Sequence, residues 1–361
     1  MESNKQEIKP IPPSITGLQL LNSLKKFEPF STGHRQIDCQ LWSRPLKRNR
    51  SDTPTLSYPP LTGLSRRQHL QIDGPPGSGK TKLVIGLALR ARTASLIRHG
   101  GSEQIEVLLI DSDASLHPTL IQRSAKALVE SCYQDRDDSK LVERICDGCH
   151  LVRITTTPEL GFFFKHLPVW LKSHPKVLPT NRIFFAFVDS VAPSYFHLFL
   201  SHLDQVKLVI LDSITAHTRY VSMSLSQRKT IAKIIKEGLT SASSQYDCAI
   251  VVTSQLATKS VTNQGTYTNL KTLTPPDFGP NFWSSSSKDE SSSTTKTHRI
   301  GSLSFKLSRI CLMFNPDCSR RAIVLENDKI IQPRQTILYE IDDIGIYDPT
   351  TPKPTGSDQP R

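Results

Sequence analysis

The stretch that decides the fold is QIDGPPGSGKTKLVIGLALRA, residues 71–91. It fits the pattern G-x-x-x-x-G-K-[ST], in which glycines free backbone N–H groups to surround phosphates and the lysine reaches the outer phosphate oxygens. An apolar run precedes this turn and apolar residues recur at helical spacing after it, so the turn joins a buried strand to a helix whose N-terminus faces an anion. The stretch predicts a nucleotide site, with a purely structural turn as the alternative. Its expected residues are Gly74, Pro75, Pro76, Gly77, Ser78, Gly79, Lys80 and Thr81, the last of which also holds Mg²⁺.

Strand-like and helix-like runs alternate between residues 61 and 252. The expected strands are 69–73, 105–111, 149–155, 182–187, 206–212 and 248–254, and the expected helices are 80–92, 117–133, 158–172 and 226–243. This alternation predicts an α/β fold with a mostly parallel twisted sheet and helices on both faces. Two further runs, 302–314 and 320–327, are spaced as a C-terminal antiparallel hairpin around NPDCS.

Composition divides the chain into a core and its additions. Residues 1–60 are expected to form an N-terminal segment and basic linker, partly disordered. Residues 61–330 form the predicted core, with a flexible Ser/Thr-rich insert at about 256–300. Residues 331–361 are interpreted as a polar C-terminal tail.

Bulk properties narrow the class of protein. At 361 residues and 37% hydrophobic content, the chain can bury one large core. Neither a membrane-spanning run nor an apolar N-terminal segment is evident, and seven cysteines without disulfide spacing favour a reducing compartment. The 45 Lys and Arg against 33 Asp and Glu give a net charge of +12, which favours a polyanion such as nucleic acid over a merely solvated basic face only when other evidence agrees.

Acidic residues end two of the expected strands. Asp212 ends VKLVILD, where its carboxylate is placed to hold Mg²⁺ beside the phosphates. Asp111 and Asp113 end the strand that follows the first helix, where a carboxylate suits a base that orients water for hydrolysis. The alternative is that these aspartates only cap the helices that follow.

Cys146 and Cys149, with His150, form CDGCH, which is half of a tetrahedral zinc site. Because no second ligand pair follows at suitable spacing, reduced structural cysteines are the simpler interpretation. The sequence leaves open whether the pair binds a metal.

An ordered set of segments resembles the RecA/RadA recombinase superfamily, and within it the eukaryotic strand-exchange recombinases and their paralogues. The resemblance runs from about residue 30 to 327. The segments that carry it are FSTGHRQID (30–38), LLIDSDASLHPTLI (108–121), LVILDSITAHTRY (208–220), IVVTSQLATK (250–259), PPDFGPNFW (275–283) and HRIGSLSFKL (298–307).

The resemblance implies a RecA-like P-loop NTPase core that binds ATP and Mg²⁺. It implies that Asp212 holds the magnesium shell, that Asp113 stands at the position of the water-orienting base, and that Gln255 senses the γ-phosphate and signals to the loop after it. It also implies DNA contacts for the basic residues of two loops, Arg219, Lys259 and Lys271.

Departures from the family pattern indicate an accessory member. Asp113 stands where the family has glutamate, which is one methylene longer, so slow hydrolysis is expected. The first DNA loop is shorter, and residues 1–60 contain neither a helix-hairpin-helix-like domain nor the Phe-x-x-Ala signature of filament-forming members.

The resulting hypothesis is a nuclear, ATP-binding, DNA-dependent ATPase-type recombinase paralogue acting in homologous recombination and double-strand-break repair. It would help a recombinase load on single-stranded or branched DNA, as part of a hetero-oligomer with other paralogues or the recombinase. The alternatives are a catalytically weak scaffold subunit of the same fold and an unrelated P-loop kinase.

Overall fold

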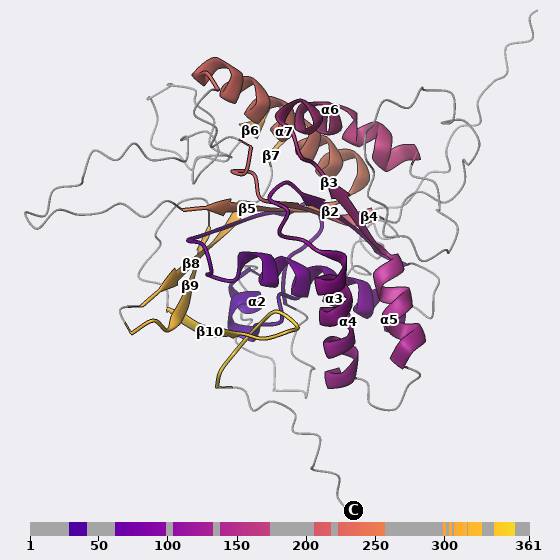
Figure 1. Ribbon diagram of the computed structural model, residues 1–361, viewed down its shortest axis with the longest axis vertical. Helices are drawn as coiled ribbons and strands as arrows, with labels where there is room; N and C mark the ends of the chain where they lie inside the picture. Colours follow the sequence, from indigo (N-terminus) through magenta and orange to yellow (C-terminus); the bar gives the residue numbers. More distant parts are fainter. Residues whose placement is uncertain are drawn as a thin grey trace, which may run out of the picture.

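The structure is a computed structural model of residues 1–361 (Figure 1). It describes residues 29–41, 62–98, 104–132, 138–173, 206–217, 223–256, 299–300, 303–304, 307–315, 317–326 and 336–350. Every structural statement below concerns these residues.

A nine-stranded, mostly parallel sheet forms the centre of the molecule, with the strand order β11-β10-β9-β8-β1-β5-β4-β2-β3. Neighbours from β8 to β3 are parallel, whereas β8, β9, β10 and β11 pair antiparallel in turn. The strands are β1 (His69–Gly74), β2 (Glu106–Asp111), β3 (Cys149–Arg153), β4 (Val206–Asp212), β5 (Ala249–Gln255), β8 (Leu307–Phe314), β9 (Arg320–Glu326), β10 (Ile337–Ile341) and β11 (Ile346–Tyr347). A separate two-stranded ribbon joins β6 (Arg299–Ile300) and β7 (Leu303–Ser304).

Helices cover the sheet on two sides (Figure 1). One layer contains α2 (Arg35–Leu41), α3 (Lys80–Arg98), α4 (Pro118–Cys132) and α5 (Asp138–Asp147); the other contains α6 (Thr157–Ser173) and α7 (Leu225–Tyr246). Two hydrophobic clusters result, one under each layer. Because side chains alternate along a strand, β2 supplies both: Val107 and Leu109 pack under α3, and Leu108 and Ile110 pack under α6 and α7.

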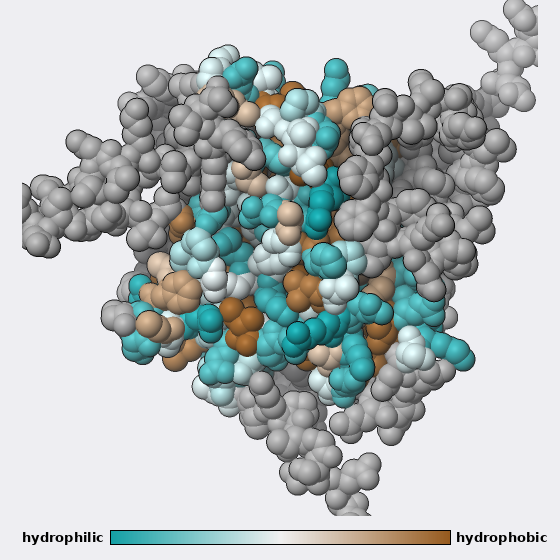
Figure 2. Space-filling model, viewed as in Figure 1, coloured by the Kyte–Doolittle hydropathy of each residue, from teal (hydrophilic) through white to brown (hydrophobic). Residues whose placement is uncertain are grey.

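The surface of the described chain is mostly hydrophilic where Figure 2 shows it, as expected when the apolar side chains are buried in the two clusters. On the face that Figure 2 shows, hydrophobic residues of the described chain occur in small patches among hydrophilic ones. None of the helices described is both long and apolar enough to cross a lipid bilayer.

The sequence-based elements are largely confirmed. The α/β class, the mostly parallel sheet, the helices on both faces and the C-terminal antiparallel hairpin β8–β9 are all present, and only the expected strand 182–187 lies outside the described residues. Helix α3 extends to Arg98, six residues beyond its expected end. Helix α5 was not expected, because its apolar positions are few: Leu141 and Ile145, one helical turn apart, form its buried stripe.

Two boundaries need correction. The interpretation of 331–361 as a polar tail is wrong for residues 336–350, because β10 and β11 extend the sheet and bury Ile337, Tyr339 and Ile346. The core also starts before residue 61, since Ile37 and Leu41 of α2 are fully buried in it. The body of the expected insert, 257–298, lies outside the described residues.

Candidate functional site

The candidate site lies at the edge of the sheet where the parallel strands end. Strands β2, β4, β5 and β1 are neighbours, and their registers place Asp111 opposite Asp212 and Gly74 opposite Gln255. The carboxyl edge of an open parallel sheet is where ligands of α/β proteins bind. The topology therefore brings the residues expected for the site to one edge, beside the glycine-rich loop formed by residues 74–81.

The glycine-rich loop has the backbone that its sequence requires. Gly77 and Gly79 have φ of +77° and +91°, a region that favours glycine. The Lys80 ammonium folds back over the loop and donates to the carbonyl oxygens of Gly74 and Pro75, at 2.9 Å each. The Ser78 hydroxyl is buried and forms no hydrogen bond with a described residue. A lysine charge over a turn with an unsatisfied buried donor fits an anionic ligand.

Asp212 collects hydroxyl donors at the end of β4. Its Oδ2 accepts from Thr81 Oγ1 at 2.8 Å and from Ser115 Oγ at 3.1 Å, while Thr253 Oγ1 donates to Oδ1. Burial raises the pKa of Asp212 despite these hydrogen bonds, and the nearby Asp111 acts in the same direction. Because the donors are neutral hydroxyls, a cation would relieve the charge of this buried carboxylate.

This donor set fits Mg²⁺ better than a metal held by protein side chains alone. No three His, Cys, Asp or Glu side chains in the described part of the chain gather into a metal-binding group. Mg²⁺ commonly binds one or two protein oxygens, with phosphates and water completing its shell. The Thr81 hydroxyl and the Asp212 carboxylate, 2.8 Å apart, are oxygens of that kind.

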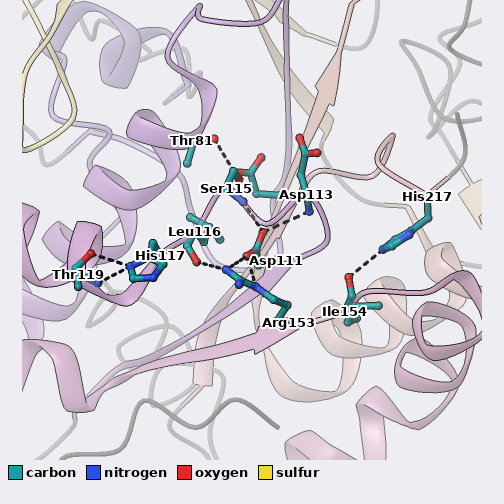
Figure 3. A network of polar contacts seen from close by, with 11 residues as sticks. Thr81, Asp111, Asp113, Ser115, Leu116, His117, Thr119, Arg153, Ile154 and His217 are labelled. Carbon is teal, nitrogen blue, oxygen red and sulfur yellow. Dashed lines mark hydrogen bonds and ion pairs between the residues drawn. The ribbon is translucent and has the colours of Figure 1, made fainter. Parts of the chain in front are cut away.

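Asp111 anchors the loop that follows β2 (Figure 3). It is fully buried and receives two hydrogen bonds from Arg153, from Nε at 3.0 Å and Nη2 at 2.9 Å. Its other oxygen accepts from the backbone N–H of Asp113 at 3.3 Å and of Ser115 at 3.1 Å. Sequence reasoning missed Arg153. Arg153 ends β3 directly beside Asp111, and only the pairing register of β2 and β3 shows this.

Asp113 itself is exposed, and its carboxylate points away from Asp111 and Arg153 (Figure 3). No hydrogen bond or ion pair joins that carboxylate to another described residue. It does not cap α4, which begins at Pro118; the backbone N–H of Thr119 donates instead to the ring of His117, at 3.3 Å. The capping alternative is therefore not supported for Asp113.

Gln255 ends β5 next to the glycine-rich loop. Its backbone N–H donates to Thr215 Oγ1 at 3.2 Å, and the N–H of Leu256 donates to the carbonyl oxygen of Gly74 at 3.0 Å. The Thr215 and Ser213 hydroxyls are 3.1 Å apart. The segment that begins at Leu256 is thus tied directly to the first residue of the glycine-rich loop. Sequence reasoning did not single out Thr215.

The structure leaves the remaining candidate residues outside the description of this site. The expected DNA contacts Arg219, Lys259 and Lys271 lie outside the described residues. Burial raises the pKa of Cys146 to about 11 and of Cys149 to about 12. Both thiols are therefore protonated near neutral pH in the metal-free chain.

His150 also has a partner that is not a metal, because its Nε2 lies 3.0 Å from a carboxylate oxygen of Glu106. This contact fits the interpretation of CDGCH as a structural segment. No protein-family model matches the chain, and no curated protein matches it.

Proposed function

We propose that the chain is an ATP-binding protein with a RecA-like core, a recombinase paralogue that acts with DNA in homologous recombination. The observation that carries the proposal is the contact of 2.8 Å between the Thr81 hydroxyl and the Asp212 carboxylate. It joins the last residue of the glycine-rich loop to the acid at the end of β4, the two groups expected to share one magnesium ion.

The residues of the site have separable roles in this proposal. The backbone N–H groups of residues 74–81 and the Lys80 ammonium would hold the phosphates, and Thr81 and Asp212 would hold Mg²⁺. When bound, Mg²⁺ neutralises phosphate charge that develops during hydrolysis. Thr253 and Ser115 orient the Asp212 carboxylate through their hydroxyls.

Asp113 decides between two versions of the proposal. As a base it would orient water, and its exposed carboxylate at the site edge can reach solvent. The same observation favours a second candidate, a scaffold subunit that binds ATP and hydrolyses it slowly, because no described side chain holds this carboxylate in place. A metabolic kinase remains the third possibility, and it would transfer phosphate to a small molecule without any effect of DNA.

Coupling to DNA is supported by the backbone hydrogen bond from Leu256 to Gly74. A change in the glycine-rich loop on nucleotide binding would act on the first residue of the 256–300 segment, in which Lys259 and Lys271 are proposed to meet DNA phosphates. The net charge of +12 fits a polyanionic partner. Binding of DNA and nucleotide must then strengthen each other equally.

The test of the nucleotide site is Lys80→Ala, with Lys126→Ala as the matched control. Both lysines lie on the α3–α4 layer, but Lys126 is exposed and pairs with Glu130 of its own helix. Calorimetric titration with Mg²⁺ and ATP should show binding by the wild type and by Lys126→Ala, and none by Lys80→Ala. Equal affinity in all three chains would refute the assignment of the loop.

The test of the DNA role measures ATP hydrolysis with and without single-stranded DNA. Stimulation by DNA supports the ATPase version, and ATP binding with negligible turnover supports the scaffold. A variant in which a short glycine linker replaces residues 260–298 should keep ATP binding but lose most ATP-dependent affinity for DNA. Unchanged DNA affinity in that variant would remove the segment from the proposal.

A further inference from the structure

The carboxy-terminal strands reach the glycine-rich loop from the side opposite β5. Strands β10 and β11 form a second hairpin over residues 337–347, distinct from β8–β9 and called the C-terminal hairpin from here on, at the far end of the sheet from β3. The Tyr339 hydroxyl donates to the carbonyl oxygen of Ser78 at 2.6 Å, and only 2% of Tyr339 is exposed. A residue 261 positions away in the sequence therefore holds the backbone of the loop.

The hairpin is itself fixed at both ends. Asp342 closes its turn by accepting from the backbone N–H groups of Ile344 at 2.9 Å and Gly345 at 3.0 Å. Arg123 of α4 donates to Asp343 at 2.9 Å. At the other end, His34 Nε2 donates to the carbonyl oxygen of Leu338 at 2.9 Å. The tyrosine hydroxyl therefore approaches Ser78 from an anchored element.

Close packing adds to the hydrogen bond. A Cβ placed on Gly79 would lie 2.5 Å from Ile341 Cδ1, so the hairpin fills the space beside the loop. About two helical turns further on, a Cβ on Gly86 would lie 2.9 Å from the carbonyl oxygen of Ile344. The loop and the start of α3 thus rest on the hairpin without intervening space.

The direction of the Ser78 carbonyl matters because it belongs to the same peptide unit as the N–H of Gly79. In a trans peptide the C=O and N–H groups point in opposite directions. Tyr339 holds the C=O toward the hairpin, so the N–H of Gly79 points away from it. Donors fixed in advance bind an anion without the cost of ordering them at the moment of binding.

We infer that Tyr339 is a positioning residue for the glycine-rich loop, setting the peptide between Ser78 and Gly79 so that its N–H is ready for a phosphate. The inference rests on the proposed nucleotide site and adds the C-terminal hairpin to it. Nucleotide binding and docking of the hairpin then support each other, because each fixes the same peptide.

The experiment compares Tyr339→Phe with Tyr347→Phe. Both variants lose one tyrosine hydroxyl from the same hairpin, but the Tyr347 hydroxyl donates to Glu340 of the neighbouring strand β10. Losing a hydrogen bond of ordinary strength should weaken Mg²⁺–ADP and pyrophosphate binding about 3- to 10-fold in Tyr339→Phe. Tyr347→Phe should bind both as the wild type does. Pyrophosphate is included because it lacks the base, and the effect acts through phosphate.

Hydrogen exchange separates positioning from a purely structural role. Mg²⁺–ADP should slow amide exchange in residues 337–347 of the wild type, and Tyr339→Phe should reduce that protection at temperatures where it is fully folded. A lower melting temperature in Tyr339→Phe with unchanged affinities would overturn the inference. Should the variant not fold, absence of nucleotide-dependent protection in the wild-type hairpin would overturn it as well. Failure of the wild type to bind any nucleotide would instead remove the proposed function, and this inference with it.

Discussion

Two glycines of the glycine-rich loop provide a matched test of how the C-terminal hairpin supports it. Gly77 and Gly79 both have positive φ, so alanine at either costs about 1–2 kcal/mol in backbone strain. A Cβ on Gly77 meets nothing within 4 Å, whereas one on Gly79 lies 2.5 Å from Ile341 Cδ1. Because Cδ1 is the end of a side chain that can shift, overpacking adds about 1 kcal/mol, the low end of its range. We expect Gly79→Ala to lower the free energy of unfolding by about 2–3 kcal/mol and Gly77→Ala by about 1–2 kcal/mol.

Ile341→Val isolates the steric part, because it removes Cδ1 and little else. Alone it should cost about 0.5–1.5 kcal/mol. The double variant Gly79→Ala with Ile341→Val should lose about 1 kcal/mol less free energy of unfolding than the sum of the two single changes. The double variant Gly77→Ala with Ile341→Val should lose the sum of its two single changes. Urea denaturation of the nucleotide-free chains, followed by circular dichroism, measures all of these values. Equal costs for the two glycines, together with additivity in both pairs, would refute the packing argument.

Three further predictions concern the site and its surroundings. Asp113→Glu should raise ATP hydrolysis about 10-fold or more at unchanged stability, because the longer carboxylate reaches the water that a base must orient; a fall in turnover would contradict that role. Burial raises the pKa of Asp212 above its ordinary 3.8, so the wild type loses stability as the pH rises from the ordinary pKa through the raised one. Denaturation should therefore show the free energy of unfolding of Asp212→Asn rising relative to that of the wild type over this pH range. The variant should also lose Mg²⁺-dependent nucleotide binding. A difference in the free energy of unfolding that does not change with pH would contradict the prediction. Iodoacetamide at pH 8 should label the exposed Cys132 and Cys318 well before Cys149, whose pKa is raised to about 12 by burial; equal labelling in a mass-spectrometric time course would disagree.

Apolar runs and glycine positions along the sequence predicted the strands and the loop that depend on neighbouring residues. Strand β4 was predicted at its observed bounds, because VKLVILD contains the apolar run LVIL and ends in an acid. The glycine-rich loop was predicted because positive φ requires glycine at fixed positions. Strand β10 was missed because ILYEI does not alternate in hydropathy, since its exposed residue Leu338 is apolar, and because polar residues dominate the composition of the last thirty residues.

The contacts that were missed depend on register and tertiary position. Arg153 meets Asp111 only because β3 pairs with β2 at that register, and Tyr339 meets Ser78 only because the hairpin joins the sheet edge beside α3. Asp111 and Asp113 look equivalent as sequence, yet burial makes the first an anchor and exposure leaves the second available. No periodicity in the chain encodes that difference.

If the proposed function holds, nucleotide binding and hydrolysis depend on separate residues of one site. Thr81, Asp212 and Thr253 are joined by hydroxyl–carboxylate contacts that do not include Asp113. The described contact of Asp113 is made by its backbone N–H with Asp111, so a change in its side chain leaves the proposed binding residues in place. A ligand that binds only the folded chain stabilises it by about 4 kcal/mol at 1,000 times its Kd. ATP would therefore stabilise the loop, the hairpin and the segment after Gln255 together even without turnover. The ATPase and scaffold versions of the proposal thus differ at Asp113 alone, and both need the rest of the site intact.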